Sequence, residues 1–319
     1  MTPNDRALVT GAAGFIGSHL AHRLVADGIE VVGFDDLSDG SLDNLRDSPE
    51  VRFVEADLCD DAAVAEAARG CAAIYHQGAK RSVPRSMEQP GLTTDVNVRG
   101  TLNVLLAARD AAAVVVAASS SSVYGDQSEF PLRESMTLAP RSPYAVSKLA
   151  LEVYCAGIGL SYGVPTVALR YFNVYGPGQD PESEYAAVVP RFAVACLSGA
   201  RPEVHGDGEQ SRDFTYIDDV VEANLRSARA PSEAHGRAFN IGGGGEPTSV
   251  NTLLSLVASA AGADPDPVYT GTRAGDVRMT QADVSLAERL LGFVPTVPID
   301  EGVRRTVEWF RNTLEEAAS

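Results

Sequence analysis

The feature that most constrains this chain is a glycine-rich turn close to its start. The stretch TGAAGFIGSHL carries Gly11, Gly14 and Gly17 in a GxxGxxG spacing, directly after the β-rich run RALVT. The residues that follow have helical spacing, so the turn joins a strand to a helix. Backbone N–H groups at such a helix N-terminus can approach an anion, which the helix dipole also favours. The stretch therefore predicts a phosphate-binding turn inside a βαβ unit.

Strand-like and helix-like runs alternate through the first half of the chain. The runs EVVGFDD, VRFVEADL, AAIYHQGA, AVVVAASSS and TVALRYFNVYG are β-rich, and helical segments such as SPYAVSKLALEVYCAGIGLSYG separate them. Alternation of this kind is typical of parallel strands joined by right-handed crossovers. We therefore expect an α/β fold with a Rossmann-like, doubly wound parallel sheet.

The regular alternation of strand-like and helix-like runs ends after Tyr175. The stretch GPGQDPESEY is rich in turn formers, and the later helices and short strands lack a regular alternation. We expect residues 1–175 to form the first domain and residues 176–319 to form a smaller α/β substrate-binding domain. A return segment of about residues 212–228 is expected to pack on the first domain.

Composition argues against several classes of protein. The formal net charge of -17 repels phosphate backbones, so we expect no nucleic-acid partner. The longest apolar run, residues 111–118, is too short to cross a bilayer, and the N-terminal residues do not resemble a signal peptide. We therefore expect a cytoplasmic protein with no membrane partner. Four cysteines without a CxxC pair and five scattered histidines predict no metal site.

Acidic residues at strand ends indicate the cofactor. Asp35 ends the second strand, 18 residues after Gly17. A carboxylate there can accept hydrogen bonds from the ribose hydroxyls of an adenine nucleotide and repels a 2′-phosphate, which favours NAD over NADP. Asp36 either joins this site or only shapes a turn. Asp57 and Leu58, at the end of the third strand, could contact adenine, with a turn role for Asp57 left open.

A tyrosine and a lysine in SPYAVSK form a candidate acid–base pair. Tyr144 and Lys148 are four residues apart, so they share one face of a helix. A cation beside a phenol, with a positive nicotinamide ring nearby, favours the phenolate and lowers the pKa of the tyrosine. The pair is therefore suited to act as a general base near neutral pH.

Together these motifs resemble the extended short-chain dehydrogenase/reductase superfamily, and within it the NAD-dependent nucleotide-sugar 4-epimerases. The resemblance covers nearly the whole chain, through TGAAGFIGSHL, HQGAKRSVPRS, SSSSVYG, SPYAVSK, LRYFNVYGPGQDP, GDGEQSRDFTYIDDVV, FNIGGG and RAGDVRMTQAD. It implies NAD as cofactor, a UDP-sugar as substrate and 4-epimerisation through a transient 4-keto sugar. It also implies a homodimer formed through the helices around residues 95–110 and 143–160.

The resemblance assigns the catalytic residues Ser120, Tyr144 and Lys148. Sugar-nucleotide dehydratases carry carboxylates after the serine, and uronic-acid decarboxylases carry a glutamate at the position of Ser122. Here Ser121 and Ser122 stand in those places. Because no acid is available for elimination, the resemblance favours an enzyme that oxidises and re-reduces its substrate without removing water.

The resemblance also implies two larger sets of binding residues. The expected cofactor-binding residues are Gly11, Gly14, Phe15, Ile16, Gly17, Asp35, Asp36, Asp57, Leu58, Gln77, Gly78, Ala79, Arg81, Asn97, Tyr144, Lys148, Tyr171 and Phe172. The expected substrate-binding residues are Ser82, Val83, Ser120, Ser121, Ser122, Asn173, Val188, Val204, His205, Gly206, Arg212, Arg273, Asp276 and Thr280. Within the second set, the two arginines are expected to bind the diphosphate and Asp276 the uridine ribose.

Thr280 matches a position beside the C2 substituent of the sugar. A tyrosine there restricts relatives to glucose and galactose, whereas a small residue leaves room for an N-acetyl group. The resemblance therefore predicts UDP-N-acetylglucosamine and UDP-N-acetylgalactosamine, UDP-glucose and UDP-galactose, or both pairs, as substrates. A UDP-glucuronate 4-epimerase is the main alternative, with Arg85 or Arg191 holding the carboxylate. A UDP-hexosamine dehydratase and a non-catalytic NAD-sensing protein are further alternatives.

Overall fold

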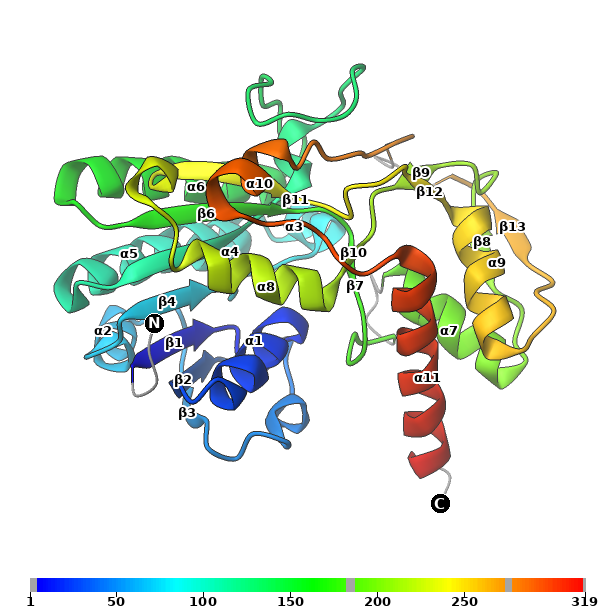
Figure 1. Ribbon diagram of the computed structural model, residues 1–319, viewed down its shortest axis with the longest axis horizontal. Helices are drawn as coiled ribbons and strands as arrows, with labels where there is room; N and C mark the ends of the chain where they lie inside the picture. Colours follow the sequence, from blue (N-terminus) through cyan, green and yellow to red (C-terminus); the bar gives the residue numbers. More distant parts are fainter. Residues whose placement is uncertain (1–4, 182–186, 273–276, 318–319) are drawn as a thin grey trace.

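A seven-stranded parallel sheet forms the centre of the molecule (Figure 1). The computed structural model describes residues 5–181, 187–272 and 277–317. The strands are β1 (Arg6–Thr10), β2 (Glu30–Asp35), β3 (Arg52–Glu55), β4 (Ala73–His76), β5 (Val114–Ser120), β6 (Thr166–Tyr171) and β11 (Arg237–Ile241). Their order across the sheet is β11-β6-β5-β4-β1-β2-β3, the Rossmann order with one further edge strand. The expected fold class is therefore confirmed.

Helices cover both faces of this sheet, because successive side chains of a strand point to opposite sides. On β1, Leu8 packs in one hydrophobic cluster with Val104 of α5 and Leu151 of α6. Its neighbour Val9 packs in another cluster with Leu24 of α1 and residues of α8. The helices are α1 (Phe15–Ala26) and α8 (Ile217–Ser227) on one face, and α2 (Asp61–Ala68), α5 (Gly100–Ala111) and α6 (Pro143–Tyr162) on the other.

The C-terminal part of the chain builds a smaller lobe beside the sheet, at the right of Figure 1. Its helices α7 (Val188–Ser198), α9 (Val250–Ala261) and α11 (Ile299–Ala317) pack against one another. Three pairs of very short strands accompany them: β7 (Val174–Tyr175) with β10 (Thr215–Tyr216), β8 (Glu203–His205) with β13 (Val268–Thr270), and β9 (Ser211–Arg212) with β12 (Thr248–Ser249).

After residue 175, the expected domain boundary, the chain returns to the central sheet several times. Helix α8 packs against α1, where the return segment was expected. Strand β11 then pairs in parallel with β6, and α10 (Ser285–Leu291) packs against β11. Residues 237–241 were assigned to the second domain, and the sequence analysis missed them as a sheet strand. The reason is that β11 follows its partner after a long excursion, so no local alternation marks it.

Short helices complete the described structure and connect the strand ends. They are η1 (Leu42–Leu45), α3 (Val83–Glu88), α4 (Pro90–Thr94), the π-helical turn η2 (Asp95–Arg99), η3 (Ser121–Tyr124) and η4 (Ser232–Ala234). Among the described residues, no helix has both the length and the apolar character needed to span a membrane. Over the same residues, no group of three or more histidine, cysteine or acidic side chains is arranged to hold a metal ion.

Candidate active site

A cleft of about 200 Å³ opens at the carboxyl ends of β1, β2 and β4. Ligands of doubly wound sheets bind at this point, where the strand order reverses. Fifteen of the eighteen expected cofactor residues line the cleft: Gly11, Gly14, Phe15, Ile16, Gly17, Asp35, Asp36, Leu58, Gln77, Gly78, Ala79, Arg81, Tyr144, Lys148 and Tyr171. The other three, Asp57, Asn97 and Phe172, are not among its lining residues.

The glycine turn is shaped by close approach of backbone to backbone. Gly11 has a φ of +68°, and its N–H donates to the carbonyl of Phe34 at 2.8 Å. A Cβ on Gly11 would lie 2.7 Å from the nitrogen of Gly78, and one on Gly17 would lie 2.0 Å from the carbonyl oxygen of Gly11. Neither position has room for a side chain. The cradle therefore fits the pyrophosphate of a dinucleotide, with the N-terminus of α1 behind it.

Asp35 reaches the cleft from the end of β2. Its carboxylate accepts from the N–H of Ala13 at 3.0 Å and from the N–H of Leu37 at 2.9 Å. Burial raises the pKa of Asp35, although these two hydrogen bonds oppose the shift. Asp57 differs, because it is exposed and its carboxylate accepts from the N–H of Cys59 at 2.8 Å. Asp57 therefore shapes a turn outside the cleft.

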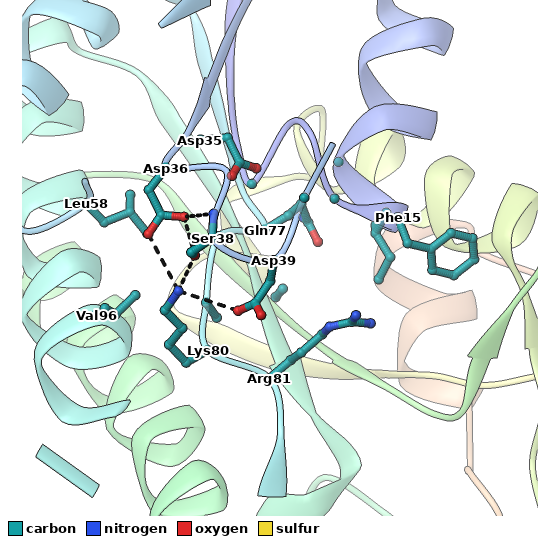
Figure 2. A pocket seen from close by; sticks show the side chains of 18 of the residues that line it. Phe15, Asp35, Asp36, Ser38, Asp39, Leu58, Gln77, Lys80, Arg81 and Val96 are labelled. Atoms are coloured by element: carbon teal, nitrogen blue, oxygen red, sulfur yellow. Dashed lines mark hydrogen bonds and ion pairs between the residues drawn. The ribbon is translucent and has the colours of Figure 1, made fainter. Parts of the chain in front are cut away.

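The sequence analysis missed four residues along one side of the cleft, which we call the charged strap. They are Ser38, Asp39, Gly40 and Lys80, and all four line the cleft. The ammonium of Lys80 lies 3.5 Å from a carboxylate oxygen of Asp36 and 3.5 Å from one of Asp39, and it also donates to the hydroxyl of Ser38 (Figure 2). The only sequence signal was the position of Lys80, one residue after the expected Ala79 at the end of β4.

Helix α6 carries Tyr144 and Lys148 to the cleft. Ser142 caps the helix by accepting from the N–H of Ala145 at 3.1 Å, and Pro143 occupies its first turn. Lys148 is 4% exposed, and its ammonium donates to the carbonyl of Ala118 at 2.8 Å. The same ammonium lies 5.9 Å from the ring centroid of Tyr144. The expected pair therefore lies on one helix face, pointing to the end of β5.

Ser120 joins the pair from the end of β5. Its side chain opposes the rise in the pKa of the Tyr144 phenol, and its oxygen accepts from the hydroxyl of Ser122 at 2.9 Å. Ser121 and Ser122 open the short helix η3 directly after it. The structure thus brings together Ser120, Tyr144 and Lys148, with serine hydroxyls where dehydratases carry acids.

The pKa of Tyr144 does not shift in the expected direction in the protein alone. Burial raises it, while the hydrogen bond to Ser120 and the charge of Arg81 oppose the shift. Lys148 does not approach the phenol oxygen closely, because its ammonium is held by the carbonyl of Ala118. Burial lowers the pKa of Lys148 to about 8. The tyrosine is therefore a protonated group in this state, and a further positive charge is needed to favour its phenolate.

The residues behind the cleft hold its walls in place. The amide of Asn97 donates to the carbonyl of Lys80 at 3.0 Å and accepts from the N–H of Lys80 at 2.7 Å. The hydroxyl of Tyr171 donates to Gln77 at 3.1 Å. Phe172 is fully buried against Tyr124 and does not face the cleft. Asn97 therefore supports the strand end, as expected, without lining the cleft.

The expected substrate residues come from several short elements. Asn173, with a φ of +30°, donates from its amide to the hydroxyl of Thr280 at 3.1 Å. The N–H of Thr280 donates to the carbonyl of Ser211, next to Arg212. Arg273 and Asp276 lie outside the described residues. The remaining members are Val83 at the start of α3, Val188 at the start of α7, and Val204, His205 and Gly206 on and after β8.

A second cavity of about 540 Å³ adjoins the first, since Ser38, Asp39, Gly40, Lys80 and Arg81 line both. The expected substrate residue Ser82 lines this second cavity, together with Asp180 and with Trp309 from α11. None of the other described substrate residues lines either cavity; Ser120, Asn173, Arg212 and Thr280 are among those that do not.

Comparison with known proteins identifies the family. The model of the NAD-dependent epimerase/dehydratase family matches residues 7–242. The UDP-glucose 4-epimerase of Mycolicibacterium smegmatis is 43% identical over 313 residues, which are 96% of this chain and 99% of that protein. Other relatives carry the names UDP-glucuronate 4-epimerase and dTDP-glucose 4,6-dehydratase, so similarity by itself does not select one sugar.

Two solved structures show the same architecture over nearly the whole chain. The UDP-glucose 4-epimerase of Thermotoga maritima, solved with UDP-glucose, is 37% identical with a TM-score of 0.92, covering 97% of this chain and 99% of that one. The UDP-N-acetylglucosamine 4-epimerase of Methanobrevibacter ruminantium, solved with UDP-N-acetylmuramic acid, is 36% identical with a TM-score of 0.92, covering 98% and 100%. The chain therefore belongs to the NAD-dependent epimerase/dehydratase family, as an NAD-dependent enzyme of the extended short-chain dehydrogenase/reductase superfamily.

Proposed function

We propose that the protein is a UDP-hexose 4-epimerase that keeps its NAD tightly bound and acts in the cytoplasm. The observation that carries the proposal is the cluster of Ser120, Tyr144 and Lys148 at the cleft, followed by the serines Ser121 and Ser122 instead of carboxylates. Relatives that match nearly the whole chain and carry 4-epimerase names support the same reading.

The residues of the cleft fit NAD. The turn around Gly11 would hold the pyrophosphate, Asp35 the adenine ribose, and Lys148 the nicotinamide ribose. When bound, NAD supplies the hydride acceptor and donor at the sugar carbon. Its positive nicotinamide also supplies the charge that lowers the pKa of Tyr144 toward neutrality. The charged strap of Ser38, Asp39 and Lys80 lies across the cleft and would retain the cofactor between turnovers.

The protein's own residues take one proton from the sugar 4-hydroxyl and later return it. Tyr144, directly or through Ser120, accepts the proton of the sugar 4-hydroxyl while that carbon is oxidised. The same phenol returns the proton after the 4-keto sugar has turned its other face to the cofactor. The cycle is redox-neutral, and Lys148 keeps one orientation throughout because the carbonyl of Ala118 holds its ammonium. Positioning and proton transfer are the contribution of the chain.

The serines after Ser120 argue against a dehydratase. Elimination of water from the keto sugar needs an acid and a base beside the sugar, and the stretch from 119 to 125 contains no carboxylate. The hydroxyl of Ser122 instead donates to Ser120 at 2.9 Å. A site with this donor set can hold the keto sugar without promoting loss of water.

Thr280 supports N-acetylated sugars among the substrates. Its side chain is small, and its hydroxyl is held by the amide of Asn173 at 3.1 Å. This leaves the space that a tyrosine would fill. The diphosphate and uridine would be anchored by Arg212, Arg273 and Asp276, which gives the C-terminal lobe its role as the nucleotide-sugar half of the enzyme.

UDP-glucuronate remains the alternative substrate, and the arginines that could hold its carboxylate argue against it. Arg85 pairs with Asp39 at 2.8 Å, and Arg191 pairs with Glu203 at 3.1 Å. Each guanidinium therefore already has a carboxylate partner in the protein. A uronate would have to displace one of these partners.

A stripe of apolar side chains on α6 supports the proposed homodimer. Val146, Val153 and Leu160 are spaced by seven residues and are 53%, 64% and 89% exposed, so they form one continuous face. Three such side chains in solvent are unusual for a monomer. The substitution Leu160→Glu should shift the protein from dimer to monomer in light scattering. A wild type that is already monomeric at micromolar concentration would remove this part of the proposal.

The substrate is tested by proton NMR of the purified enzyme with UDP-N-acetylglucosamine, UDP-glucose and UDP-glucuronate in separate tubes, with no NAD added. We expect a 4-epimeric anomeric signal to grow in the first two tubes. Turnover of UDP-glucuronate alone would contradict the role given to Thr280. Deoxy-methyl or vinyl signals would identify a dehydratase, and no reaction even after NAD is added would remove the epimerase proposal.

A further inference from the structure

A group of four arginines lies outside the cofactor cleft, at the edge of the sheet formed by β11. A cavity of about 490 Å³ opens there, between β6, β11 and α10, which Figure 1 shows side by side. None of its lining residues belongs to the cofactor cleft. They are Arg133, Glu134, Ser135, Arg170, Arg237, Ala238, Asp283, Ser285, Leu286 and Arg289.

The charge of this cavity is opposite in sign to that of the chain. Four arginines and two carboxylates line it, in a protein whose formal net charge is -17. Salt screens the distant negative charges over about 8 Å at physiological ionic strength, so the local arginines dominate inside the cavity. Burial raises the pKa of Glu134, which makes its charge the easier of the two to neutralise. Asp283 lies 3.6 Å from Arg133, within its own ion pair.

Two of the arginines have no partner within the described part of the chain. Arg237 begins β11 and Arg289 lies on α10, both exposed, and neither has a hydrogen bond or an ion pair to another described residue. Most other arginines of the chain are paired with a carboxylate, as Arg191 is with Glu203. Two unpaired guanidinium groups at one cavity leave donors available for a ligand, and their planar fork matches phosphate oxygens.

Buried side-chain hydrogen bonds connect one residue of the cavity wall, Arg170, to the SSSSVYG stretch. Arg170 is 4% exposed, and its guanidinium donates to both oxygens of Glu152, at 2.9 and 2.8 Å, and to the hydroxyl of Tyr124 at 2.8 Å. Glu152 also accepts from the hydroxyl of Ser119, the residue before Ser120. A ligand that contacts Arg170 would therefore be joined to the SSSSVYG stretch by side-chain hydrogen bonds.

We propose that this cavity binds a small phosphate-bearing molecule, with Arg237 and Arg289 as its main ligands. The volume is in the range of small-molecule sites, roughly 300–1,000 Å³. Ala238 and Leu286 give one apolar wall, while Ser135 and Ser285 add hydroxyls that can donate to phosphate oxygens. The cavity shares no lining residue with the cofactor cleft, so NAD bound in the cleft would not occupy it.

The proposal is tested by isothermal titration of inorganic pyrophosphate, and in a second arm inorganic phosphate, into the full-length NAD-loaded protein. No nucleotide other than NAD is added, because its phosphates would compete for the cavity, and sodium chloride keeps the ionic strength equal. The test variant is Arg237→Ala with Arg289→Ala. The control is Arg52→Ala, since Arg52 is likewise an exposed first residue of an edge strand, β3, at the opposite edge of the sheet.

We expect saturable binding of pyrophosphate to the wild type, at least tenfold weaker binding to the double variant and no change in Arg52→Ala. Replacement of both arginines by lysine, which keeps the charge, should restore part of the affinity. An unaltered affinity in the double variant, an equal loss in Arg52→Ala, or no binding to the wild type at 10 mM would each overturn the proposal. Because the readout is the difference in heat of binding between the wild type and the double variant, failure of the epimerase assignment does not alter these outcomes.

Discussion

The cofactor cleft and the proposed substrate region are built in different ways. Residues of the cleft come from the ends of neighbouring parallel strands, and close backbone contacts such as that between Gly11 and Gly17 fix their positions. Residues of the substrate region come from strands of two or three residues and from loops, held by single side-chain bonds such as Asn173 to Thr280. We therefore expect the cofactor cleft to tolerate little change, and the proposed substrate region to change its specificity through single substitutions.

The largest expected effect comes from Tyr144→Phe. Loss of the phenol removes the proton carrier, and turnover should fall by about a thousandfold, within the range of roughly 10²–10⁴ for general acid–base groups. Bound NAD, measured from the absorbance of the purified protein, should stay near wild type. Tyr154→Phe, on the same helix but with its ring partly in solvent, is the control and should leave turnover unchanged. Equal activity of wild type and Tyr144→Phe would rule out the tyrosine as the proton carrier.

The next largest effect is expected for Thr280→Tyr, which should affect the proposed substrate region and leave the cofactor cleft unchanged. A tyrosine should fill the space beside the sugar C2 substituent and lower turnover of UDP-N-acetylglucosamine about 100-fold, the upper part of what one pocket contact achieves. UDP-glucose turnover and NAD content should change little, because Thr280 does not line the cofactor cleft. Thr280→Ser keeps the hydroxyl that Asn173 contacts and should retain both activities. Parallel loss of both substrates would contradict the specificity role.

A smaller effect is expected for Gly17→Ala, which tests whether the close approach of Gly17 to the backbone of Gly11 shapes the cleft. The new Cβ would lie 2.0 Å from the carbonyl oxygen of Gly11, so the turn must shift. Overpacking of this kind costs about 1–3 kcal/mol, and NAD should become exchangeable on a desalting column. Gly157→Ala is a matched control, because nothing lies within 4 Å of its new Cβ on α6. If both variants retain NAD equally, the close approach is not what shapes the cleft.

The smallest effect is a pH dependence of stability centred on Asp213, in the substrate half. Burial raises the pKa of its carboxyl to about 6, although the N–H groups of Ala282 and Gly243 donate to it. The folded state therefore holds more protons than the unfolded state between about pH 4 and 6. Stability should fall as pH rises through this window, by at most about 1.4 kcal/mol per pH unit from this group. Urea unfolding at pH 4.5 and 6.5 should show this slope in the wild type and lose it in Asp213→Asn.

Local motifs made the cofactor half predictable from sequence. Gly11, Asp35 and Tyr144 each act through a turn, a strand end or one helix face, so spacing along the chain was enough to place them. Lys80 was missed because its role depends on the loop from Ser38 to Asp39, which is distant in sequence. The resemblance named Asn97 and Phe172 as cofactor residues, but neither lines the cleft: Asn97 hydrogen-bonds Lys80, and Phe172 is buried against Tyr124.

The part of the fold built by the second half of the chain was less predictable, because its geometry depends on contacts between distant segments. The pairing of β11 with β6 joins segments about 70 residues apart, and no short pattern encodes it. The arginine cavity likewise combines residues of β6, β11, α10 and the loop at Arg133. The lowered pKa of Tyr144 was predicted with a nicotinamide nearby and stays a prediction. In the protein alone burial raises the pKa of Tyr144, and the ammonium of Lys148 is held by a backbone carbonyl.

The central claim is that one site oxidises and re-reduces the same sugar carbon without removing water. The direct measurement is the reaction of UDP-glucose in D2O, followed by proton NMR. We predict a 4-epimer whose carbon-bound protons keep their full integrals, because the hydrogen taken from C4 returns to C4 and no other carbon is deprotonated. Deuterium at C5 or in a new methyl group would show elimination, and would contradict the assignment of Ser121 and Ser122 to a site that only carries out oxidation and reduction.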